Sequence, residues 1–72
     1  MGRDVVPGFG DDVRSAREGM GMSRRDLAKA VGSSYSGLTQ VERGERSASL
    51  ELAVRLAREL DMDLNKYKEM KA

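Results

Sequence analysis

The sequence predicts a small all-α domain, on three observations. The chain has 72 residues, which is enough for one domain with one modest core. Beyond residue 10 it is rich in arginine, glutamate, leucine, alanine, methionine and lysine, which are good helix formers, whereas its only proline, Pro7, lies before that point. Serines and glycines stand where apolar repeats of helical spacing begin and end. We therefore expect a compact bundle of short helices.

The first ten residues are expected to form a flexible arm rather than part of the bundle. Residues 1–10 contain three glycines and a proline, which break regular structure. The folded domain is then expected over residues 11–70. Its first helix should start at Asp11, because Asp11 and Asp12 suit the positive end of a helix dipole, and it should end near residues 19–21.

Two short helices are expected next, separated by a turn. Ser23 is a good N-cap for the second helix. Gly32 follows that helix at the place where a left-handed residue is needed, and glycine adopts this conformation without steric cost. Ser33 and Ser34 supply the next N-cap, and the third helix, over about residues 34–43, is stopped by Gly44.

The last part of the chain predicts two more helices, which makes five in all. Ser49 caps a fourth helix with a broad apolar face. This face consists of Leu50, Ala53, Val54, Leu56, Ala57 and Leu60. A short fifth helix is expected to begin at Asp63 and to carry Leu64, Tyr67 and Met70.

The composition excludes several classes of function. With no cysteine and no histidine, the chain has no disulfide, no thiolate or imidazole metal site, and no cysteine or histidine catalysis. Asp61 and Asp63 are two carboxylates without further ligands, a pattern typical of helix-end caps rather than of a metal site. We therefore expect no enzyme, no catalytic residue, no cofactor and no bound metal.

Charge and hydropathy restrict the partners less strongly. Thirteen basic and twelve acidic residues give a formal net charge of +1, so the overall charge does not favour a nucleic-acid partner. No stretch approaches the roughly 18 apolar residues of a membrane span, and the first ten residues lack the apolar segment of a signal peptide. The expected location is the cytoplasm, and any DNA contact must follow from where the charges sit.

The second and third helices together fit a helix-turn-helix, in which two short helices are joined by a tight turn containing glycine. The close crossing of the helices requires small and apolar side chains at particular positions. The positions that meet this requirement are Leu27, Ala28, Val31, Gly32, Leu38 and Val41.

The stretch MSRRDLAKAVGSSYSGLTQVERG, from Met22 to Gly44, resembles the phage-repressor and Cro-like (XRE) helix-turn-helix family. The resemblance extends upstream over Val13 to Arg17 and downstream over SLELAVRLARELDMDL. It implies a lambda-repressor-like bundle of five helices whose third helix enters the major groove of DNA. It also implies that Arg24 replaces a phosphate-contacting glutamine, and that the region after the fourth helix commonly forms a dimer.

The exposed face of the third helix has the chemistry that such a role requires. With about 3.6 residues per turn, its polar residues fall opposite Leu38 and Val41, and none of them is acidic. Gln40 can both donate to and accept from adenine. The candidates for reading bases are Tyr35, Ser36, Thr39 and Gln40, and those for binding the DNA backbone are Arg24, Ser34, Arg43 and Arg46.

Two residues of the third helix do not fit a base-reading role. Gly37 offers no side chain to a base, so it is either a tolerated small residue or a point of close approach to DNA. Glu42 is acidic beside the expected interface, and we expect it to pair with Arg17 or Arg46 or to cap neighbouring backbone rather than to contact DNA.

The function expected from the sequence is sequence-specific binding of double-stranded DNA by a cytoplasmic, nucleoid-associated transcription regulator, most simply a repressor. Because one recognition helix reads few base pairs, a homodimer on two half-sites is expected. Five apolar residues are expected to form either a dimer face or the edge of the core, and the sequence favours neither. They are Leu52, Met62, Leu64, Tyr67 and Met70. The alternatives are an antitoxin that binds a toxin protein and its own promoter, and a protein-interaction module that does not bind DNA.

Overall fold

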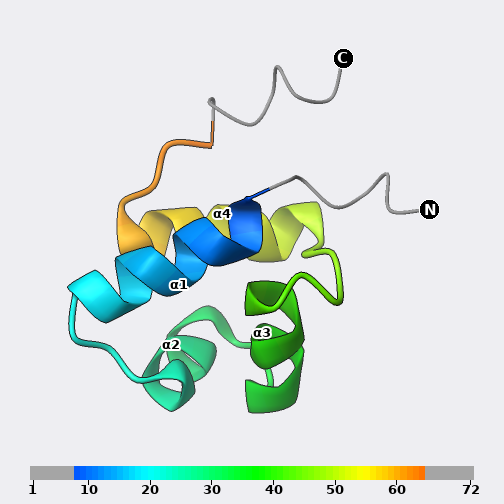
Figure 1. The fold of residues 1–72 in the computed structure, drawn as a ribbon, viewed down its shortest axis with the longest axis horizontal. Helices are drawn as coiled ribbons and strands as arrows, with labels where there is room; N and C mark the ends of the chain where they lie inside the picture. The colour runs from blue at the N-terminus through cyan, green and yellow to red at the C-terminus, as the bar shows by residue number, and fades with distance from the viewer. Residues whose placement is uncertain (1–7, 65–72) are drawn as a thin grey trace.

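The computed structural model describes residues 8–64, which form four α-helices and no strand. The helices are α1 (Phe9–Gly19), α2 (Arg24–Val31), α3 (Tyr35–Glu42) and α4 (Leu50–Leu60). They lie in two layers, with α1 and α4 in one and α2 and α3 in the other (Figure 1). No helix within the described part of the chain is long and apolar enough to cross a membrane.

The expected fifth helix does not begin at Asp63. Asp63 and Leu64 follow α4 without helical structure. The rest of that expected helix, including Tyr67 and Met70, lies outside the described residues, as do residues 1–7.

Serines start three of the four helices, as the sequence predicts, and of Ser33 and Ser34 it is Ser34 that caps α3. The side-chain oxygens of Ser23, Ser34 and Ser49 accept hydrogen bonds from the backbone N–H groups three residues later, at 3.0, 2.9 and 3.1 Å. Each bond satisfies one of the N–H groups that a helix leaves without an internal partner. Gly32 ends α2 in the left-handed conformation, with φ of 71°, so the predicted turn between α2 and α3 is confirmed.

The start of α1 differs from the expectation. The helix begins at Phe9 rather than at Asp11, after Gly8 at its N-cap. Phe9 is only 7% exposed and belongs to the hydrophobic core. A Cβ atom on Gly10 would overlap the backbone carbonyl oxygen of Val41, so α1 lies directly against the end of α3. Residues 8–10 are therefore part of the folded unit and not of an arm.

A single core joins the two layers. It confirms Leu27, Ala28, Val31, Leu38 and Val41 as the packed positions of the helix-turn-helix. The other buried members are Phe9, Val13, Leu56 and Leu60.

Two predictions about apolar residues have different outcomes. The apolar repeat places Leu50 on the buried face of α4, but Leu50 is the first residue of that helix and is 79% exposed. Leu52, Met62 and Leu64 are half-buried and pack against the core, so within one chain they form the edge of the core.

Candidate nucleic-acid interface

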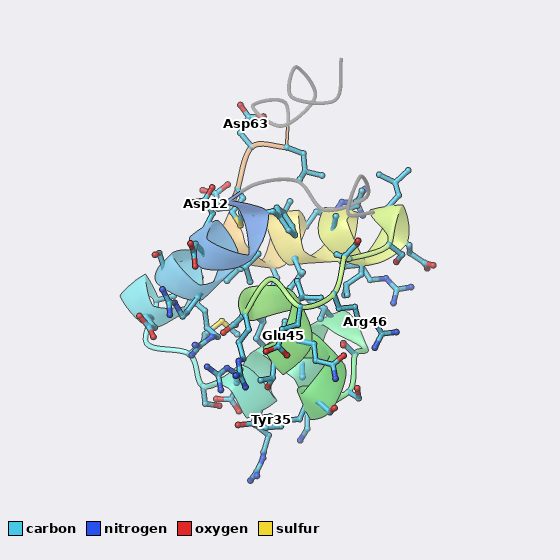
Figure 2. All side chains as sticks on the ribbon, turned by 45° about the vertical axis from the view of Figure 1, so that its right-hand side comes forward. Asp12, Tyr35, Glu45, Arg46 and Asp63 are labelled. Carbon is cyan, nitrogen blue, oxygen red and sulfur yellow. The ribbon has the colours of Figure 1, made fainter. Side chains whose placement is uncertain are left out.

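Helix α3 has one buried side and one exposed side. Leu38 and Val41 are buried in the core, whereas Tyr35 is 50% exposed and Ser36 is also exposed. Figure 2 shows Tyr35 at the end of the molecule far from α1 and α4. The predicted polar face is therefore available to a partner, and it runs along the outer layer of the fold.

The two remaining base-reading candidates are less exposed. Thr39 and Gln40 are both half-buried. The Thr39 hydroxyl donates a hydrogen bond to the backbone carbonyl of Tyr35 at 2.9 Å. Since this bond uses its only O–H donor, the Thr39 oxygen offers a ligand its lone pairs, while Gln40 carries an amide with both donors and an acceptor.

The only acidic residue of α3 is removed from the exposed face. The Glu42 side chain is 1% exposed, and Arg17 of α1 donates to both of its carboxylate oxygens, from Nε at 2.8 Å and from Nη2 at 3.2 Å. Arg17 is itself buried and also donates from Nη1 to the Met22 carbonyl at 2.9 Å. The predicted pairing of Glu42 with Arg17 is thus confirmed.

A second, half-buried arginine binds the same carboxylate. Arg24, the first residue of α2, donates from Nε to Glu42 Oε1 at 3.0 Å. The hydrogen bond to Glu42, and next the one to the Tyr35 side chain, raise the pKa of Arg24 above its ordinary value. The sequence predicts Arg24 only as a contact to the DNA backbone, and the structure shows that it also links α2 to α3.

The two C-terminal arginines of the interface are placed differently from each other. Arg43 follows α3, its side chain is largely exposed, and it pairs with Glu45 at 3.3 Å. Arg46 lies in the loop before α4 and is exposed (Figure 2). Its Nη1 atom lies 3.7 Å from the point that a Cβ atom on Gly37 would occupy.

The surroundings of Gly37 give this residue a role that the sequence does not indicate. A Cβ atom at this position would lie 3.0 Å from the Ser34 Oγ atom that caps α3, besides lying close to Arg46. The contact with the cap is tight, whereas 3.7 Å from Arg46 is an ordinary van der Waals distance. The glycine therefore leaves room mainly for the Ser34 cap.

Sequence reasoning missed one link at this interface, from Arg24 to Glu42, which joins residues 18 positions apart. It also did not indicate that Arg46 lies near Gly37. A lone acid next to several arginines signals an ion pair, but without the fold it does not indicate which arginines take part. The described residues contain no cluster of three or more acidic side chains able to hold a metal ion.

Comparison with known families decides the affiliation of this fold. The family described as Helix-turn-helix matches residues 13–67, which is most of the chain. The protein belongs to this family. As a helix-turn-helix protein of the XRE type it is a DNA-binding domain and not an enzyme.

A solved structure supports the same assignment for nearly the whole chain. The protein is similar to the restriction-modification controller protein C.AhdI from Aeromonas hydrophila, with 34% sequence identity and a TM-score of 0.76. The match covers 86% of this chain and 94% of C.AhdI. No curated protein sequence matches the chain.

Proposed function

We propose that this helix-turn-helix protein is a transcription regulator that binds specific double-stranded DNA sequences with α3 in the major groove. The observation that supports this most directly is the charge arrangement on α3. Its one carboxylate, that of Glu42, is buried and paired with Arg17 and Arg24. The exposed face of α3 therefore carries no negative charge that would repel phosphates, and Arg46 and Arg43, the latter paired with Glu45, lie beside it.

The dimensions of α3 suit this role. Its eight residues make a rod of about 12 Å, comparable to the width of the major groove. We assign base reading to Tyr35, Ser36, Thr39 and Gln40, with Gln40 best suited to a two-sided contact with adenine. The backbone contacts are assigned to Arg24, Ser34, Arg43 and Arg46.

The biological setting that we propose follows from C.AhdI. That protein is a restriction-modification controller, and 94% of its length is matched here. We infer that this chain likewise controls a set of restriction-modification genes, in the cytoplasm, and that it represses by occluding the promoter. Binding as a homodimer to two half-sites about 34 Å apart supplies the specificity that a single short helix lacks.

The test is selection of bound sequences from random double-stranded DNA. We expect enrichment of a motif with two-fold symmetry that occurs upstream of restriction-modification genes in the source genome. The Gln40→Ala variant should relax the preference at one base pair per half-site, at a cost of about 1 to 3 kcal/mol. The exposed residue Arg58 of α4 provides a control, since Arg58→Ala should leave the motif unchanged. If the wild-type protein enriches no motif, the proposal is wrong, and an interaction module or a toxin-binding protein becomes the better hypothesis.

A further inference from the structure

The buried carboxylate of Glu42 has a second partner besides Arg17. Arg17 already binds both of its oxygens. The additional bond from Arg24 Nε, at 3.0 Å, reaches Glu42 from a side chain that is 31% exposed. One end of Arg24 is thus fixed in the interior while the side chain still reaches the surface.

We propose that Glu42 is a positioning residue for DNA binding, because it fixes Arg24 so that Arg24 and the neighbouring Tyr35 form a site for one phosphate of the DNA backbone. The inference rests on the proposed function and adds to it a role for an acidic residue that does not itself touch DNA.

The atoms used by each bond support positioning rather than competition. A carboxylate that bound the two Nη groups of Arg24 would occupy the donors that a phosphate needs. Glu42 accepts from Nε instead. The two Nη nitrogens carry four more N–H donors, so the same guanidinium can bind a carboxylate on one edge and a phosphate oxygen on another.

The surroundings of Glu42 keep this arrangement in place. The two bonds from Arg17 set the orientation of the carboxylate, and the 1% exposure of the side chain excludes solvent from it. Arg17 also pairs with the exposed carboxylate of Glu18, 3.7 Å from its Nη2 atom, whereas the ion pair described for Arg24 is with Glu42, which Arg17 shares. Arg24 is also the more exposed of the two arginines, so it is the one whose charge can act at the surface.

The location of Arg24 fits a phosphate. Arg24 is the first residue of α2 and Tyr35 is the first residue of α3, and the Tyr35 side chain contributes, after Glu42, to raising the pKa of Arg24. The positive ends of two helix dipoles therefore lie close to the same guanidinium. The Tyr35 hydroxyl, a base-reading candidate by periodicity alone, is in this arrangement a second donor for the same anion.

The test measures binding to a random-sequence DNA duplex by fluorescence anisotropy between 50 and 200 mM salt. We expect Arg24→Gln to weaken binding about tenfold at 50 mM salt. Loss of one phosphate contact also lowers the magnitude of the slope of log affinity against log salt concentration by about 0.9. The tenfold difference from the wild type should therefore shrink about 3- to 4-fold at 200 mM salt. Arg24→Lys keeps the charge but lacks the two-edged guanidinium, and we expect it to behave like Arg24→Gln. The matched control, Arg58→Gln, removes the same charge from an exposed site on α4 and should change binding less than twofold.

The role of Glu42 is tested by a double-mutant cycle. In a Glu42→Gln background, Arg24→Gln should cost less than about twofold, because Arg24 is no longer held in place. The inference is overturned if Arg24→Lys has the affinity and the salt dependence of the wild-type protein. It is also overturned if Glu42→Gln folds and Arg24→Gln weakens binding as much in that background as in the wild type. If circular dichroism shows that Glu42→Gln is unfolded, the inference is tested by comparing Arg24→Gln with Arg24→Lys. Failure of the wild-type protein to bind any duplex would instead contradict the proposed function.

Discussion

The close approach of α1 to the end of α3 predicts the effect of a very small substitution. Gly10 lies in the first turn of α1, and a Cβ atom there would overlap the Val41 carbonyl oxygen and lie 3.0 Å from that of Glu42. Both neighbours are backbone atoms at the end of α3, and they cannot rotate away as a side chain would. Gly10→Ala therefore forces α1 and α3 apart.

The magnitude follows from two opposing effects. Overpacking a core contact costs about 1 to 3 kcal/mol, and the rigid backbone neighbours place this site at the upper end. Alanine regains at most about 1 kcal/mol relative to glycine in a helix. The net loss should be about 2 kcal/mol, which for a domain of this size lowers the melting temperature by roughly 8 to 16 °C.

The same helix offers a matched control. Gly19 ends α1, and a Cβ atom there would have no neighbour within 4 Å. Gly19→Ala should be neutral or slightly stabilising. Urea and thermal unfolding followed by far-ultraviolet circular dichroism compare the two variants directly. If Gly10→Ala is as stable as Gly19→Ala, the contact between α1 and α3 is wrong.

Three further substitutions probe the fold. Phe9→Ala should destabilise the domain by about 3 to 5 kcal/mol in urea unfolding, because it removes a buried aromatic ring from the core. A loss below about 1 kcal/mol would mean that Phe9 is not part of the core. Ser34→Ala should cost about 1 kcal/mol through loss of the 2.9 Å cap of α3, and an unchanged melting temperature would argue against that cap. Leu50→Ala should change the stability of the isolated chain by less than about 0.5 kcal/mol, whereas a large loss that depends on protein concentration would show that Leu50 is buried between two chains.

Local signals in the sequence were sufficient where the physical cause is local. A serine cap and a left-handed glycine act within three or four residues, so Ser23, Ser34, Ser49 and Gly32 could be placed without the fold. The apolar spacing of Leu27 and its partners depends only on the helical repeat, which the packed core confirms.

The features that escaped prediction depend on distant contacts. Gly8 and Gly10 look like helix breakers in the sequence, yet Gly10 is required by the backbone of α3, and Phe9 is buried as a result. Leu50 fits the apolar repeat of α4, but as the first residue of that helix it is exposed, whereas Leu52 in the same turn packs against the core. The bond between Arg24 and Glu42 requires the crossing of α2 and α3, which no spacing rule describes.

The buried group around Glu42 also affects how α3 moves. Its C-terminal end is tied to α1 and α2 through Arg17 and Arg24, and pulling it away would leave a charge without a partner in the interior. We therefore expect hydrogen exchange to be slower at that end than at the exposed first turn, which the Ser34 cap holds. In the DNA complex proposed above, such a difference would let the first turn of α3 adjust while the end that carries Glu42 keeps the orientation of the helix.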